Sequence, residues 1–178
     1  MCLNLTRCDV IAMTTDLYRC QHAQIMLRLI QLEALVAQCD IVAHAAAFRE
    51  RIADLCCRLA THCAAEDSLL YPQLSDQADA AGKALAKRFE EEMVCLMQVF
   101  RDYARRWQLA DAIETRPTNF KVESLDLTTS LIERIRLENE QLLPLADEVS
   151  ERPREYRSSL GRRAQLSSLP SLMLASGA

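Results

Sequence analysis

The chain has few residues that interrupt helices or supply flat aromatic rings. Only 3 of its 178 residues are glycine and 5 are proline, so it lacks the frequent turn residues of an all-β fold. Aromatic residues make up 5% of the chain although half of the residues are hydrophobic, so leucine and alanine must fill much of the core. Both are strong helix formers. The composition therefore favours long helices with few connections.

The signals of several functional classes are also missing. The net charge of -4 gives no basic surface for nucleic acid. No apolar run approaches the ~18 residues of a membrane-spanning helix, and residues 1–15 lack the apolar stretch of a signal peptide. A glycine-rich phosphate loop, a Gly-x-Ser-x-Gly elbow and a nucleophile paired with a base at readable spacing are all lacking. We therefore expect no nucleic-acid partner, no membrane association and no enzyme activity.

The 8 cysteines include no CxxC pair and are scattered through stretches with helical periodicity. A disulfide scaffold is typical of shorter, secreted chains. Reduced thiols that pack as small hydrophobic side chains are the better interpretation. We accordingly expect a cytoplasmic protein.

Apolar residues recur with the 3.6-residue period of a helix in four blocks, at roughly 16–39, 45–71, 78–107 and 124–149. Four such helices in a chain of this length predict an all-α, single-domain, antiparallel up-down four-helix bundle. We place the bundle at residues 16–150.

Residues at the ends of these blocks predict the connections. Thr14 or Thr15 is expected to cap the first helix just before Asp16. The longest irregular connection is expected around 116–119, which contains Pro117. Residues 1–15 would form a separate N-terminal segment. Residues 151–178, rich in arginine and serine, would form a tail that is either mobile or a docking segment for a protein partner.

Two similar motifs place polar residues four apart on one helical face. They span 62–72 and 134–144, and each ends in an apolar pair followed by a proline, which is expected to end the helix. His62 and Glu66 lie in the row of Ile52, Leu55, Leu59 and Leu69 on the second helix. Arg134 and Glu138 interrupt the apolar stripe of the fourth helix. Side chains four apart lie one above the other, as a chelating pair requires.

Other polar residues fall on inward stripes near the middle of the bundle. His22 lies on the stripe of the first helix, and either Glu92 or Met93 fills a gap in the stripe of the third. Buried carboxylates require a cation. The sequence offers two, a bound metal ion or Arg134, and does not choose between them.

These motifs resemble those of the hemerythrin-like (HHE cation-binding) family over roughly 16–148. The resemblance implies a metal site in which His22 and His62 match the histidines of the first two helices, and Glu66 and Glu138 match the two bridging carboxylates. Glu138-Asn139 followed by Leu-Leu-Pro is similar to the fourth-helix motif of the iron-centre repair branch.

Two positions depart from the family pattern. The third helix carries Glu92-Met93 where the family has Glu-His, and a thioether is a poor ligand for iron. The fourth helix carries Arg134 in place of a histidine, and a guanidinium cannot bind metal. The resemblance therefore implies a degenerate non-haem iron site of one ion, two irons being less favoured. Its ligands would be His22, His62, Glu66 and Glu138, with Glu92 as a further candidate, and its function the sensing or handling of iron, oxygen or nitric oxide.

The alternative hypothesis is a metal-free regulatory bundle. Arg134 would then replace the metal by pairing with Glu138 and reaching Glu66, and the protein would bind a partner through its surface or its C-terminal tail. Arg134-Ile-Arg-Leu-Glu138-Asn139 is similar to a motif in the last helix of regulator-of-sigma-D anti-sigma proteins, which are such binding modules.

Three further residues have lesser expected roles. Tyr18 and Tyr71 are candidates to hydrogen-bond the buried polar groups. His44, in an alanine-rich connection, is expected at the surface.

Overall fold

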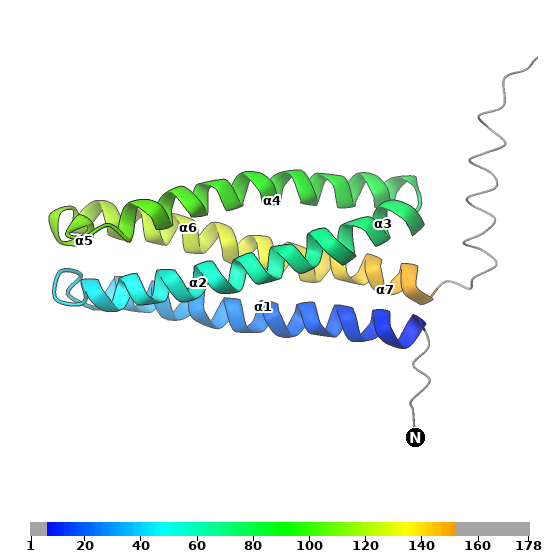
Figure 1. Ribbon diagram of the computed structural model, residues 1–178, viewed down its shortest axis with the longest axis horizontal. Helices are drawn as coiled ribbons and strands as arrows, with labels where there is room; N and C mark the ends of the chain where they lie inside the picture. The colour runs from blue at the N-terminus through cyan, green and yellow to red at the C-terminus, as the bar shows by residue number, and fades with distance from the viewer. Residues whose placement is uncertain (1–6, 152–178) are drawn as a thin grey trace, which may run out of the picture.

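Four long helical rods lie side by side in the computed structural model, which describes residues 7–151 and the side chains from Thr15 onward (Figure 1). The first rod is α1 (Arg7–Gln38), and the third is α4 (Ala80–Trp107). The second rod consists of α2 (Ala45–Ala65), the π-helix η1 (Glu66–Leu70) and α3 (Tyr71–Gln77). The fourth consists of α6 (Pro117–Leu137), the π-helix η2 (Glu138–Leu142) and α7 (Leu143–Glu151).

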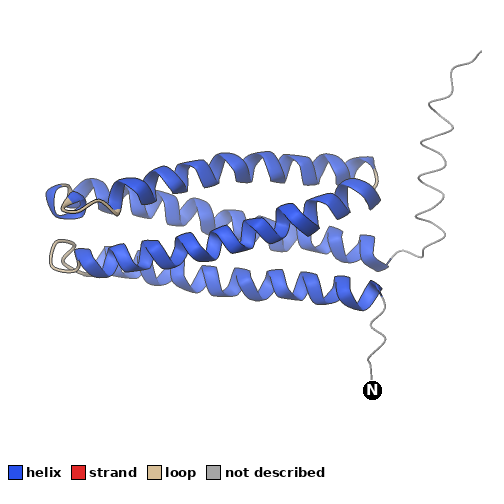
Figure 2. Cartoon of the chain, in the orientation of Figure 1, coloured by secondary structure: helices blue, strands red, loops and turns tan. Residues whose placement is uncertain are grey.

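Successive rods run in opposite directions, with connections at the two ends of the bundle, and no strand occurs between residues 7 and 151 (Figure 2). The short helix α5 (Ala112–Thr115) lies in the connection between the third and fourth rods. Within the described part of the chain, no helix is both long and apolar enough to cross a membrane. The predicted all-α, up-down four-helix bundle is confirmed.

Several predicted helix ends were wrong. The first helix begins at Arg7, and Thr15 is buried within it. A threonine that could cap a helix can also stand inside one, so the residue type alone does not fix the start. The fourth rod begins at Pro117, since proline is well tolerated in the first helical turn. The irregular connection therefore ends before Pro117. Apart from Glu151, the predicted tail lies outside the described residues.

The prolines of the two motifs do not end their helices. The backbone N–H of Tyr71 bonds to the carbonyl of Glu66, and that of Leu143 to the carbonyl of Glu138, each five residues back. This wider π turn accommodates Pro72 and Pro144, which lack an N–H and would crowd a regular α-helix. The helices then continue as α3 and α7.

The extra residue in the first π turn also shifts the buried face. Leu69, predicted to point inward, is 56% exposed, whereas Leu70 is 2% exposed. Strict 3.6-residue spacing holds only as far as Glu66, because the π turn inserts one residue into the pattern.

The core consists of two apolar clusters separated by a polar layer. One cluster fills the half of the bundle that contains α5, around Phe48, Trp107 and Phe120. The other fills the opposite half, around Tyr18, Leu74 and Phe89. The buried polar residues between them are His22, His62, Glu66, Arg134 and Glu138.

Candidate metal centre

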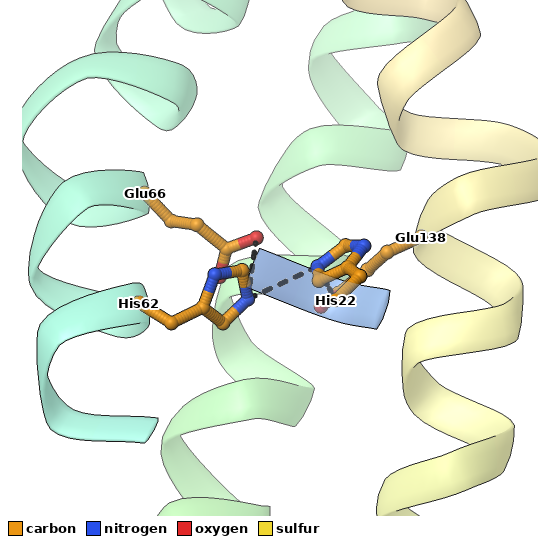
Figure 3. Close-up of side chains that lie close together, drawn as sticks. All are labelled: His22, His62, Glu66 and Glu138. Carbon is orange, nitrogen blue, oxygen red and sulfur yellow. Dashed lines mark hydrogen bonds and ion pairs between the residues drawn. The ribbon is translucent and has the colours of Figure 1, made fainter. Parts of the chain in front are cut away.

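Three rods bring four metal-ligating side chains together in the polar layer. His22 comes from α1, His62 from α2, Glu66 opens η1 and Glu138 opens η2, and all four point toward a common centre (Figure 3). One ligand atom from each lies within 4.8 Å of the others. None of these side chains is more than 1% exposed. The structure thus gathers four of the residues that the sequence nominated.

Each histidine is oriented by an amide side chain behind it. The Nδ1 atom of His22 lies 2.8 Å from Oδ1 of Asn139, and Nδ1 of His62 lies 3.1 Å from Oε1 of Gln21. An amide oxygen accepts a hydrogen bond, so both Nδ1 atoms carry the proton and donate it. Both Nε2 atoms then present lone pairs to the centre, which is the tautomer that a metal requires.

The two Nε2 atoms lie 3.1 Å apart, too close for two facing lone pairs with nothing between them. Nε2 of His22 also lies 3.2 Å from Oε2 of Glu138, and Nε2 of His62 lies 3.5 Å from Oε1 of Glu66. Four electron-rich atoms therefore converge where a cation is needed. Burial, aided by His22, lowers the pKa of His62 to about 4, so this ring is neutral near pH 7.

Glu66 lacks a hydrogen-bond partner for either carboxylate oxygen, although it is fully buried. Burial, followed by the nearby charge of Glu138, raises its pKa well above the ordinary value. An unpaired buried carboxylate costs several kcal/mol of lost hydration. The fold therefore holds Glu66 in an environment that only a cation or a proton can compensate.

Glu138 has a different environment because Arg134 lies one turn before it. Nε of Arg134 is 2.5 Å from Oε1 of Glu138. Burial by itself would raise the pKa of Glu138, but a protonated His22 ring and the Arg134 guanidinium hold it below its ordinary value. The other oxygen, Oε2, has no hydrogen-bond partner and faces the centre.

Arg134 also contacts Phe89 and Tyr71. Its Nη2 atom donates to the carbonyl of Phe89 at 2.5 Å and lies 3.4 Å from the hydroxyl of Tyr71. Its guanidinium also stacks 4.4 Å from the centre of the Phe89 ring. No hydrogen bond or ion pair joins Arg134 to Glu66. The expected reach across the core is thus wrong, because the guanidinium is already held by groups on α4, α3 and η2.

Glu92 lies outside the cluster. Its side chain is 56% exposed, and its carboxylate pairs with Arg134 at 3.2 Å. Met93 occupies the inward position of α4 at 6% exposure. The structure therefore does not bring the candidate Glu92 to the centre.

The two tyrosines and His44, which were given lesser roles from the sequence, have the following positions in the structure. The Tyr18 hydroxyl donates to the carbonyl of Ala65, so it braces the backbone just before Glu66. The Tyr71 hydroxyl accepts a hydrogen bond from Arg134. His44 is exposed at the start of α2, as predicted.

Two residues behind the histidines were not identified from the sequence. Gln21 carries no signal beyond its place next to His22. Asn139 was noted only as part of a motif, although its position directly after Glu138 was a usable clue. Cys63, next to His62, is not a member of the cluster, and burial and the charges of Glu66 and Glu138 raise the pKa of its thiol to about 12.

The residues present fit a divalent metal ion. Two neutral imidazoles and two carboxylates form a nitrogen and oxygen ligand set suited to iron, manganese or zinc. The orphaned oxygens of Glu66 and Glu138 require positive charge in the same place. The tautomers of both histidines are fixed by their outer partners, as in metal sites generally.

Fold and site together define a four-helix bundle with a buried histidine and carboxylate cluster between its helices. The sequence model of the hemerythrin HHE cation-binding domain matches residues 13–146, which is most of the chain. The protein belongs to this family. Comparison with curated proteins gave no match, and neither did comparison with solved structures.

Proposed function

We propose that this protein is a hemerythrin-like protein that binds one non-haem metal ion, with iron as the expected metal, in the bundle core. His22, His62, Glu66 and Glu138 would hold the ion. The protein would sense or handle iron, oxygen or nitric oxide, and it would act by binding and not as an enzyme. The observation that carries this proposal is Glu66, a fully buried carboxylate whose two oxygens have no hydrogen-bond partner.

Arg134 supports a single ion in place of two. Its guanidinium binds Oε1 of Glu138 and so engages the oxygen that a second ion would need. The rods also supply only two imidazoles to the centre. A bound iron would supply reversible binding of a small ligand or exchange of an electron.

A surface pocket near His62 supports access for a small ligand. It has a volume of about 330 Å³ and lies between α1 and α2, where Gln21, Cys57 and Thr61 are among its lining residues. Gln21 is the residue whose amide oxygen accepts the hydrogen bond from His62. A molecule in this pocket would therefore lie one side chain away from a metal ligand.

The cysteines support the proposed cytoplasmic location. The six cysteines whose side chains are described are all free thiols, and three of them, Cys20, Cys57 and Cys95, are exposed. Exposed thiols persist in a reducing compartment.

Replacing Glu66 by glutamine tests the proposal. The variant keeps the shape of the side chain and removes its charge, so Glu66→Gln should lose at least about 10-fold in affinity for Fe²⁺. Glu92→Gln is the matched control, since it removes a carboxylate from the same polar network but outside the cluster. Affinities are measured by competition with a chromophoric chelator. Equal affinity in Glu66→Gln and the parent would exclude Glu66 as a ligand.

The metal-free regulatory bundle remains the second candidate because Arg134 does pair with Glu138. Of the two buried carboxylates, Arg134 neutralises the charge of Glu138 alone. The metal-free hypothesis therefore leaves the buried charge of Glu66 without a cation. If the parent protein binds no Fe²⁺, Mn²⁺ or Zn²⁺, protein contacts become the better account.

A further inference from the structure

The outer face of α1 is apolar over most of its length. Leu17, Leu27 and Ile30 are each at least 50% exposed. Exposed valines also occur on α4, but Val94 lies close to the acidic run 90–92. Apolar surface of the α1 kind, when contiguous, marks an interaction site more often than chance exposure does.

Six of the exposed residues of α1 follow a strict spacing. They alternate in steps of three and four: Cys20, Ala23, Leu27, Ile30, Ala34 and Ala37. We call this set the outer seam. The exposed Asp16, one turn before Cys20, marks the charged end of this row. The buried side of α1 has the same spacing, from Tyr18 to Val36. A helix with two such seams is expected to lie between two packing partners, and the bundle itself supplies only one.

The outer seam contains no charged residue, and the residues along its two edges are mostly uncharged. One edge carries Gln24, Gln31 and Gln38. The other edge carries Arg19, Met26 and Glu33. Charge is thus limited to the two ends of one edge, with opposite signs.

The opposite charges of Arg19 and Glu33 can pair between two copies of α1 in one relative orientation of the helices. When two copies of α1 cross antiparallel with the twofold axis at residues 25–26, Arg19 of each copy comes within side-chain reach of Glu33 of the other, because like edges face each other in antiparallel pairs. In a parallel pair the same charges would face only glutamines. Arg19 also pairs with Asp147 in its own chain and keeps 40% of its side chain exposed.

The same crossing alternates large and small residues along the seam. Leu27 of one copy lies against Ala23 of the other, and Ile30 lies against Cys20. Such alternation lets two helices interlock without gaps. A twofold contact of this kind is closed, since the same surface serves both partners.

We propose that the protein forms a homodimer through an antiparallel contact between the outer seams of two α1 helices. Each copy has its His22, His62, Glu66 and Glu138 cluster on the inner side of α1. His22 would therefore lie one helix width from the interface. This inference is independent of the proposed metal function.

The mass of the full chain in solution tests the existence of the interface. Sedimentation equilibrium at micromolar concentrations should give twice the monomer mass. Leu27→Glu should weaken dimerisation by at least about 100-fold, because two uncompensated charges would be buried at the centre of the contact. Val94→Glu is the matched control, an exposed apolar residue on α4 that should leave the mass unchanged. Circular dichroism of both variants verifies that the bundle is intact.

Disulfide formation tests the direction of the contact. In the antiparallel arrangement, Ile30→Cys places a thiol opposite Cys20 of the second copy, and mild oxidation should join these two positions. The parent should not form a Cys20–Cys20 bridge, which only a parallel pair would allow. Peptide mapping identifies the linked residues.

Three results would overturn the proposal. A parent chain that stays monomeric has no such interface. A dimer that Leu27→Glu leaves unchanged is formed by another surface. A Cys20–Cys20 bridge in the parent would show the wrong orientation.

Discussion

Glu66 and Glu138 occupy the same position in two similar motifs, yet their surroundings differ. Glu138 has a guanidinium one turn before it, and Glu66 has His62 at the corresponding position. One carboxylate is therefore paired within its own helix, while the other depends on whatever occupies the centre. In the proposed function, this difference of a single residue type is the reason that the site holds one ion and not two.

Removing Arg134 should destabilise the protein strongly. Arg134→Met leaves Glu138 and the carbonyl of Phe89 without their donor in a buried place, at a cost of about 3–5 kcal/mol. Chemical denaturation of the parent and the variant measures this loss.

Arg136 is the matched control for that prediction. It lies two residues further on the same helix, is half exposed, and pairs with Glu133 and Glu140. Arg136→Met should cost less than about 1 kcal/mol. Equal losses in the two variants would mean that Arg134 is not the buried partner of Glu138.

Among single residues, the sequence predicted the members of the buried cluster better than the amide side chains behind them. His22, His62, Glu66 and Glu138 could be identified because charged groups on an apolar stripe are conspicuous. Gln21 could not, since an amide next to His22 looks like ordinary surface until the helices are packed, and for Asn139 the one clue was its place directly after Glu138. Which of Glu92 and Met93 faces inward depends on a rotation of α4 by one residue.

At the scale of elements, two π turns set the geometry of the site. Each begins at a glutamate ligand, and each is followed by a proline that the wider turn accommodates. Helical periodicity does not reveal such an insertion, because both sides of it follow the same 3.6-residue pattern. The predicted inward position of Leu69 was wrong for this reason.

The π turn of the second rod makes a simple prediction about two neighbouring leucines. Leu70→Ala removes a fully buried side chain and should lower the free energy of unfolding by about 2–5 kcal/mol. Leu69→Ala changes an exposed side chain and should have an effect within about 0.5 kcal/mol. Thermal or urea denaturation of the pair decides between the π turn and a regular helix, for which the order would be reversed.

At the scale of the whole molecule, most of the buried side chains are apolar and lie outside the polar layer. Two apolar clusters flank the polar layer, and each includes residues from all four rods. This arrangement was predictable as a bundle because long periodic blocks joined by short connections have few other ways to pack. The helix starts were less predictable, because Thr15 and Pro117 are compatible with more than one position in a helix.

Metal removal should therefore lower stability without unfolding the chain. An ion bound only by the folded state adds about 4 kcal/mol when its free concentration exceeds Kd by roughly 1,000-fold. For a chain of this size that corresponds to a Tm change of roughly 8–16 °C. Calorimetry before and after chelation measures it, with circular dichroism to show that the helices persist. A chelated protein that loses its helices would contradict the account of two self-sufficient cores.

Elemental analysis of the full chain, purified without a metal-affinity tag and loaded with Fe²⁺ under anaerobic conditions, tests the central claim most directly. The account predicts one iron per chain in the parent and none in Glu66→Gln. Two irons per chain would contradict the role assigned to Arg134. A folded parent that retains no metal would contradict the site itself.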